Sequence, residues 1–251
     1  MLKKRIIPTF LFRNNRLVKG VNFSNYRDIG EPKSNIKIFN SQNTDEIIFI
    51  NIDKKKNIDS LCAILKDASK YCFMPLTAGG GIRSLSDIKR LLVSGADKVS
   101  INSKILEDIN FLKKSSTEFG CQCIIVGIDV KKINGKYRVM KNYGKTIYKT
   151  SLEDYIKICK DCGAGEFFIN NIDRDGTRNG YNLNLAKKIE SFTDLPIIFT
   201  GGANNFNDLY QLFNCTKNTA AGCMSLFCFG DNSPIRARSY LRNRNINVKQ
   251  K

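Results

Sequence analysis

The fold is constrained above all by a regular alternation of short β-branched runs with amphipathic helical segments. Eight strand–helix units in 251 residues predict a closed (βα)8 barrel of the α/β class, which uses about 200–250 residues as one unit. The expected strands are Arg5–Phe12, Glu46–Ile52, Met74–Ala78, Lys98–Ile101, Cys123–Val130, Glu166–Asn171, Pro196–Thr200 and Thr219–Met224. An open doubly wound sheet is the alternative, but no G-x-G-x-x-G follows the first strand. We therefore expect residues 1–251 to form a single (βα)8 barrel domain.

Helices and two insertions fill the segments between these strands. Expected helices include Ile58–Tyr71, Ser84–Ser94, Ser151–Cys162, Leu183–Ser191 and Asn205–Phe213. Ser84 and Ser151 are each followed three residues later by aspartate, a pattern similar to an N-terminal capping box. The insertions are Arg13–Phe23 and Ile133–Ile147, and the second is expected to form a hairpin around Asn134-Gly135.

An internal repeat supports the barrel. The sequence EIIFINID at 46–53 matches EFFINNID at 166–173, and GGIRSLSDI at 80–88 matches GGANNFNDL at 201–209. Both offsets are close to 120 residues, and the first expected strand maps onto the fifth at a similar offset. The pattern indicates two duplicated half-barrels of four βα units each.

Composition excludes several kinds of chemistry. The chain contains no histidine, so histidine-based triads, histidine-ligated zinc and histidine acid/base catalysis are excluded. Its nine cysteines, odd in number, indicate reduced thiols and a cytoplasmic protein rather than a disulfide framework. Cys159 and Cys162 form one C-x-x-C, which lacks the second pair that a metal site needs. The net charge of +18 is spread along the chain, so we expect neither a nucleic-acid nor a membrane partner.

Two glycine-rich turns predict phosphate sites at the C-terminal ends of the strands, where (βα)8 barrels carry their active sites. Each turn precedes an expected helix, whose free backbone N–H groups favour an anion. Because the sites recur in register, they suit an elongated bisphosphate, although tight βα turns alone would also require glycine. The expected phosphate-binding residues at and near these turns are Gly80, Gly81, Asn102, Ser103, Gly201, Gly202 and Ser225.

Ordered motifs along nearly the whole chain closely resemble the cyclase subunit of imidazole glycerol phosphate synthase. They are KRIIP, NRLVKGVNF, PLTAGGGIRS, SGADKVSINS, FGCQCIIVGIDV, GAGE, DRDGTRNGY and TGGA. In that family a glutaminase subunit docks on the N-terminal face of the barrel. Ammonia passes through the barrel and reacts with a ribulosyl bisphosphate, giving imidazole glycerol phosphate and an aminoimidazole nucleotide. The resemblance implies a phosphorylated small-molecule ligand and no cofactor or metal.

The resemblance also shows where the reaction centre has changed. Two aspartates carry the acid/base steps of the family, and only the second is present, as Asp129. Leu11 stands at the position of the first, and leucine cannot transfer a proton. Asn51 and Asn170 replace a further acid and a hydroxyl residue. Lys19, Asp175 and Gly176 still match the family. The resemblance implies that Asp175 and Gly176 join the expected phosphate-binding residues and that Lys19, on the first insertion, closes over a ligand.

The opposite end of the barrel keeps the family pattern. The family has a ring of two acids and two bases at the starts of four strands, and Arg5, Glu46, Lys98 and Glu166 match all four positions. The resemblance implies that this ring gates ammonia, while a purely stabilising ion network remains the alternative. Asp97 matches a family position that faces the glutaminase.

Two hypotheses follow, which differ in whether the chain retains the lyase/cyclase activity of its family. In the first, it is a divergent paralogue that passes ammonia to another acceptor, as relatives do in bacterial surface-sugar pathways with a glutaminase and an ATP-dependent sugar amidotransferase. In the second, it is the histidine-pathway cyclase with an altered first strand. A scaffold without transport is a lesser third option. Loss of the proton-transfer residue beside an intact ring favours the first.

Overall fold

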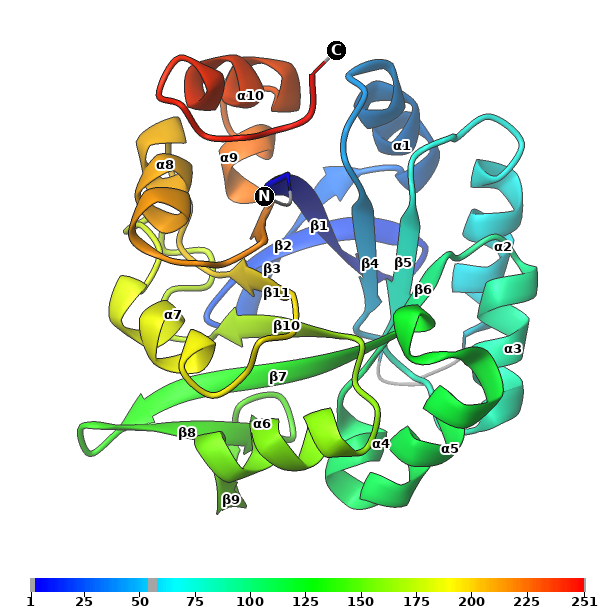
Figure 1. The fold of residues 1–251 in the computed structure, drawn as a ribbon. Coiled ribbons are helices and arrows are strands. Elements are labelled where there is room, and N and C mark those ends of the chain that lie inside the picture. Colours follow the sequence, from blue (N-terminus) through cyan, green and yellow to red (C-terminus); the bar gives the residue numbers. More distant parts are fainter. Residues whose placement is uncertain (1–2, 54–57, 251) are drawn as a thin grey trace.

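The computed structural model describes residues 3–53 and 58–250, and its central sheet closes into a barrel (Figure 1). Neighbouring strands run parallel in the order β10-β11-β12-β1-β4-β5-β6-β7, and pairing of β10 with β7 closes the circle. This closed (βα)8 barrel confirms the expected fold and excludes the open sheet. The eight strands are β1 Arg5–Arg13, β4 Ile47–Asn51, β5 Leu76–Gly79, β6 Lys98–Ile101, β7 Ile124–Ile133, β10 Glu166–Asn171, β11 Ile197–Thr200 and β12 Ala220–Cys223.

Helices surround the barrel on the outside (Figure 1). They are α1 Pro32–Ser41, α2 Asp59–Ala68, α3 Leu85–Val93, α4 Ser103–Glu107, α5 Ile109–Phe119, α6 Leu152–Asp161, α7 Leu183–Glu190, α8 Phe206–Cys215, α9 Ser225–Cys228 and α10 Pro234–Arg242, with a 3-10 turn at Cys121–Cys123. Among residues 3–53 and 58–250, no helix has the length and hydrophobicity needed to cross a membrane.

Side chains alternate between the two faces of each barrel strand, as the pleat requires. On β1, Ile6 and Phe10 pack in the large outer core against the helices, whereas Ile7 belongs to a separate cluster. That second cluster fills the interior of the barrel, and its buried members are Ile7, Ile48, Ile125, Ile198 and Ala220. The middle of the interior is therefore lined by an apolar layer.

Both insertions extend the sheet as β-hairpins. The first, residues 13–30, continues β1 into β2 Arg16–Val21 and β3 Ser24–Gly30, so it runs past the expected end at Phe23. The second, residues 131–151, continues β7 into β8 Lys136–Lys141 and β9 Thr146–Ser151. Its turn at Asn134-Gly135 has positive φ at both residues, which confirms the predicted hairpin. We refer to these segments as the first and second hairpins.

The half-barrel repeat extends to local hydrogen bonds. Ser84 and Asp87 form the predicted reciprocal capping box of α3, and Asn205 and Asp208 form the same box in α8. Ser151 caps α6, but its hydroxyl donates to the Asp154 carboxylate at 2.6 Å. That carboxylate therefore does not complete the reciprocal box expected at this position.

Candidate functional site

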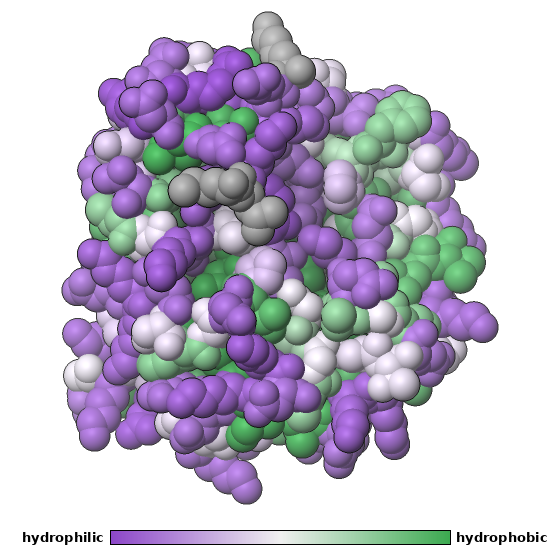
Figure 2. Space-filling model, in the orientation of Figure 1, coloured by the Kyte–Doolittle hydropathy of each residue, from purple (hydrophilic) through white to green (hydrophobic). Residues whose placement is uncertain are grey.

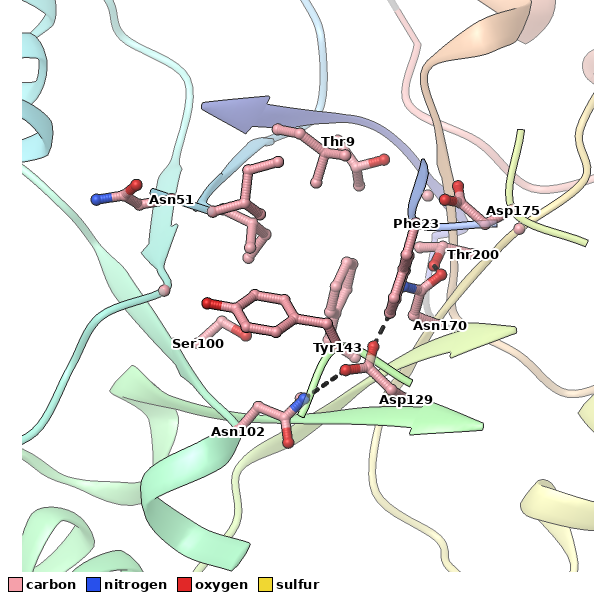
Figure 3. A pocket seen from close by; sticks show the side chains of 18 of the residues that line it. Thr9, Phe23, Asn51, Ser100, Asn102, Asp129, Tyr143, Asn170, Asp175 and Thr200 are labelled. Carbon is pink, nitrogen blue, oxygen red and sulfur yellow. Dashed lines mark hydrogen bonds between the residues drawn. The ribbon is translucent and has the colours of Figure 1, made fainter. Parts of the chain in front are cut away.

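A cavity of about 480 Å³ opens at the C-terminal ends of the barrel strands (Figure 3). The first hairpin, the second hairpin and the loops that follow β5, β6, β10, β11 and β12 contribute to its lining. The structure brings every residue expected at this end of the barrel to this one cavity: Lys19, Gly80, Gly81, Asn102, Ser103, Asp129, Asp175, Gly176, Gly201, Gly202 and Ser225.

Asp129 is held at the end of the inward face of β7 by two amides. Asn102 donates to its Oδ2 at 2.9 Å and Asn170 donates to its Oδ1 at 3.2 Å (Figure 3). Burial raises the pKa of Asp129 to about 6, against the lowering effect of the two amide donors, and the charge of Asp175 adds to the rise. Near neutral pH the carboxyl therefore titrates within reach of a ligand, as a general acid or base requires.

Leu11 faces the cavity across from this carboxyl and has hydrophobic neighbours on both adjacent strands. It lies opposite Val18 of β2 and Ile50 of β4. Nothing at this position of β1 supplies a proton donor, since the side chain itself is a hydrocarbon. The acid/base pair implied by the resemblance is thus reduced to Asp129.

The other carboxylates that line the cavity have partners of their own. Asp53 accepts a hydrogen bond from the Asn14 backbone at 2.9 Å, and Asp175 pairs with Lys19 at 2.6 Å. Glu107 lies 4.0 Å from the Lys104 ammonium and is two-thirds exposed. These contacts tie each carboxylate to a local structural partner.

Asn51 and Asn170 hold polar contacts at two strand ends. Asn51, buried at the end of β4, accepts a hydrogen bond from the Asp53 backbone at 2.9 Å. Asn170 accepts from the Thr200 hydroxyl at 3.2 Å while it donates to Asp129. Neither amide transfers a proton at ordinary pH, so both act here as hydrogen-bonding groups.

The glycine turns have an explanation in backbone packing alone. Gly80 and Gly201 have φ of 84° and 105°, and a Cβ at either position would collide with a carbonyl oxygen, that of Asn51 or of Asn171. Only glycine fits such a turn without strain. Glycine at these positions is therefore required whether or not a phosphate binds.

The helix ends that were expected to bind anions are already capped. In α3 the Asp87 carboxylate accepts from the Arg83 and Ser84 backbone, and in α8 the Asp208 carboxylate accepts from two backbone groups in the same way. These side chains occupy the N–H groups just before each helix and the Asp87 and Asp208 N–H groups within it, so anion binding at the two glycine turns stays a prediction. Side-chain caps are absent instead from the short helices α4 and α9, which begin at Ser103 and Ser225 on the cavity wall.

Lys19 and Asp175 join the first hairpin to the loop after β10. Both side chains are nearly buried, at 10% and 12% exposure, and the Asn22 backbone also donates to the Asp175 carbonyl at 3.0 Å. A Cβ on Gly176 would overlap the carbonyl oxygen of Gly20. The first hairpin is thus closely docked over one side of the cavity.

Sequence reasoning missed several residues of the cavity wall. Thr9, Ser100 and Thr200 line it from inward positions of β1, β6 and β11, which the two-residue alternation of the strands could have shown. Phe23 and Tyr143 reach over it from the tips of the two hairpins (Figure 3). Both have positive φ after an asparagine, and they are 120 residues apart, which is the offset of the internal repeat.

The four residues of the expected ring meet at the N-terminal end of the barrel, where they form a closed cycle of ion pairs. Arg5 lies 2.9 Å from Glu46 and also pairs with Glu166. Lys98 lies 2.9 Å from Glu166 and 3.4 Å from Glu46. Two positive and two negative charges therefore compensate one another; we call this set the charged ring.

The carboxylates of the charged ring are almost inaccessible, with Glu46 at 2% and Glu166 at 8% exposure. Burial acts to raise the pKa of Glu166, but Arg5 and Lys98 overcome it and hold the pKa below its usual range. On the inward face of β1, Arg5 is followed by Ile7 of the apolar layer and then by Thr9 of the cavity wall. The charged ring and the cavity thus lie at opposite ends of one interior.

The C-x-x-C lies on and just beyond α6, with Cys159 buried and Cys162 at the end of the helix. Within the residues that the structure describes, no group of histidine, cysteine or acidic side chains is arranged to hold a metal ion.

Comparison with known proteins places the chain in a family. A model of the family described as "Histidine biosynthesis protein" matches residues 5–229. The chain is 38% identical over 234 residues to imidazole glycerol phosphate synthase subunit HisF of Lactococcus lactis subsp. cremoris MG1363, covering 92% of the chain and 90% of the relative. It is 38% identical over 249 residues to a Campylobacter jejuni protein that carries the name imidazole glycerol phosphate synthase subunit hisF2, covering 99% of each. The chain therefore belongs to the histidine biosynthesis protein family, as a divergent HisF-like paralogue within it.

Proposed function

We propose that this chain is a synthase subunit that receives ammonia from a glutaminase and conducts it through the barrel to an acceptor other than the imidazole precursor. The acceptor would be a nucleotide-linked surface sugar bound to an ATP-dependent amidotransferase. There ATP activates the oxygen of an acetamido group, ammonia adds to the carbon, and the oxygen leaves with the group that ATP supplied. The observation that carries this proposal is an intact charged ring at one end of an interior whose other end has Leu11 in place of the proton-transfer aspartate.

Passage through the barrel suits ammonia in its neutral form. The apolar layer around Ile7 and Ile125 disfavours an ammonium ion, because a charge loses its hydration there without gaining a partner. The charged ring must open first, and the Lys98–Glu46 contact, at 3.4 Å, is its longest. Displacement of Lys98 toward Glu166 would open a path while both acids keep a cation.

The N-terminal face offers apolar anchors for a glutaminase. Phe73 is 91% exposed in the loop before β5, and Val93 is 77% exposed at the end of α3, before β6. Figure 2 shows hydrophobic surface over α1 and α2 among hydrophilic residues. Exposed aromatic and aliphatic side chains of this kind are typical of the centres of protein interfaces.

The cavity supports ligand binding more than ring closure. Asp129, with a pKa of about 6, offers one proton-transfer group, while each general acid/base step contributes about 10²–10⁴ in rate. The uncapped starts of α4 and α9 leave backbone N–H groups for a phosphorylated small molecule. A ligand held there without turnover fits a subunit that only delivers ammonia.

The second candidate is the histidine-pathway cyclase. Asp129 is retained, and the Lactococcus relatives bear the name of that synthase. The two functions separate in an assay of the purified chain with the ribulosyl bisphosphate and excess ammonium salt. We expect no imidazole glycerol phosphate, whereas rapid formation of it would establish the cyclase and refute our proposal.

A positive test uses the chain together with the glutaminase, glutamine, the sugar amidotransferase, ATP and a nucleotide-linked acetamido sugar. We expect an acetamidino sugar to form from glutamine only when the chain is present. Excess ammonium salt should replace glutamine and the chain together, because it supplies the nitrogen directly. Equal product from glutamine with and without the chain would contradict the proposal.

A further inference from the structure

The second hairpin carries charge of one sign only. Residues 131–151 contain seven lysines or arginines and no acid, whereas residues 13–30 of the first hairpin contain four cations and one acid. The seven cations are Lys131, Lys132, Lys136, Arg138, Lys141, Lys145 and Lys149. Two segments that the fold duplicates have thus acquired different charges.

Ion pairs compensate two of the four cations of the first hairpin, Arg16 and Lys19. Arg16 pairs with Asp28 at 2.7 Å and lies 3.4 Å from Glu31, while Lys19 pairs with Asp175 at 2.6 Å. By contrast, none of the seven cations of the second hairpin forms an ion pair with any residue in 3–53 or 58–250. Only solvent or a bound partner can therefore reduce the repulsion between these cations.

The charge lies beside exposed apolar side chains. Tyr143 is 52% exposed at the hairpin tip and Ile147 is 45% exposed on β9. β8 and β9 project from the wall of the barrel (Figure 1, green, lower left). Apolar groups surrounded by cations are typical of a surface that binds protein, because the apolar part excludes water while the charges steer the partner.

The size of the surface indicates a macromolecule. A six-residue strand such as β8 spans about 20 Å, which is longer than a small phosphorylated ligand. Lys141 and Tyr143 also line the cavity, so a protein bound to the hairpin would stand over the exit of the barrel. An acceptor of ammonia must occupy that place.

We propose that the second hairpin is the docking surface for the ammonia-accepting protein, which meets it with an acidic face. This inference rests on the proposed function and locates its partner. The cations face the side chains of that partner, and Tyr143 and Ile147 supply the apolar centre of the contact. Docking there holds the acceptor site of the partner against the mouth from which ammonia emerges.

The test measures binding of the purified sugar amidotransferase to the full chain at low and high salt. The variant K136Q/K145Q/K149Q removes three exposed charges that do not line the cavity. Because charge steering raises association rates by about 10- to 1000-fold, we expect this variant to associate about tenfold more slowly at low salt. The difference should shrink at high salt, where screening is strong.

Two matched variants separate charge from other effects. K136R/K145R/K149R keeps the charges and should bind like the unaltered chain. K113Q/K114Q/K187Q removes three exposed lysines on α5 and α7 and should also leave binding unchanged. All three variants should keep their affinity for the glutaminase, which docks at the opposite face. Unchanged affinity for the glutaminase would show that the variants are folded.

Each remaining result contradicts the inference in a distinguishable way. Equal association of the hairpin variant and the unaltered chain would refute the docking surface while leaving acceptor binding, and the proposed function, in place. No binding of the amidotransferase to the unaltered chain would refute both. Tighter binding of polyuridylate than of the amidotransferase, lost in K136Q/K145Q/K149Q, would show that the hairpin binds nucleic acid instead.

Discussion

The two ends of the barrel are built from the same strands, yet they hold their charges differently. At the N-terminal end, the buried acids of the charged ring each contact both Arg5 and Lys98. At the C-terminal end, Asp129 has two amide donors and no ion-pair partner among residues 3–53 and 58–250, and its pKa rises to about 6. The difference shows that the charges at the two ends of the barrel have separate partners, so one end can keep its residues while the other changes.

The largest effect should come from breaking the charged ring. Arg5→Met leaves Glu46 and Glu166 with Lys98 as their only cation, and an uncompensated buried charge costs about 3–5 kcal/mol. We expect a loss of that size in the free energy of unfolding, measured by urea denaturation near neutral pH. Arg16→Met, which breaks a solvent-exposed pair with Asp28, should cost far less, because water screens that pair. Equal losses would show that the charged ring is not a compensated unit.

The second-largest loss of stability should come from disturbing the contact between the first hairpin and Gly176. Gly176→Ala places a methyl group against the Gly20 carbonyl at a φ of 71° and should cost about 2–4 kcal/mol, from overpacking and backbone strain together. Gly135→Ala, at a φ of 76° with open space around it, isolates the strain and should cost about 1 kcal/mol. Thermal unfolding of both variants measures the difference. Similar losses would mean that the hairpin is not held against Gly176.

At the cavity end, removing the charge of Asp129 should stabilise the protein. Its pKa in the folded state, about 6, lies above the ordinary value of 3.8, so the folded state binds the proton more tightly. The contribution of Asp129 to the free energy of unfolding therefore falls as the pH rises from about 4 to about 6, and it stays low at higher pH. Asp129→Asn abolishes this dependence and should gain about 3 kcal/mol at neutral pH. A gain independent of pH would show that ionisation is not its cause.

The parts of the fold that could be predicted are those determined by residues close together in the sequence. The eight strands followed from β-branched runs between turn residues, and the Asn134-Gly135 hairpin followed from turn chemistry. The first hairpin was harder to recognise because its turns, Asn14-Asn15 and Asn22-Phe23, reach positive φ without glycine.

The residues of the site could be predicted where the half-barrel repeat or the resemblance identified them. Properties that depend on contacts between residues distant in sequence could not. The caps of α3 by Ser84 with Asp87 and of α8 by Asn205 with Asp208 follow from local sequence spacing alone. The pKa of Asp129 depends on burial and on Asn102 and Asn170, which come from other strands. Sequence spacing contains no measure of those contacts.

The smallest effect should come from restoring the missing acid. Leu11→Asp places a carboxyl between Val18 and Ile50, where hydrophobic neighbours raise its pKa and offer no donor to orient it. Asn51 and Asn170 also remain, so the rest of the altered centre is unchanged. We expect less than a tenfold gain in imidazole glycerol phosphate formation from the ribulosyl bisphosphate and ammonium, compared with Leu11→Asn. A working acid/base group contributes a factor of about 10² or more in rate. A gain of that size would mean that the side chain at position 11 is the only group missing for imidazole glycerol phosphate formation.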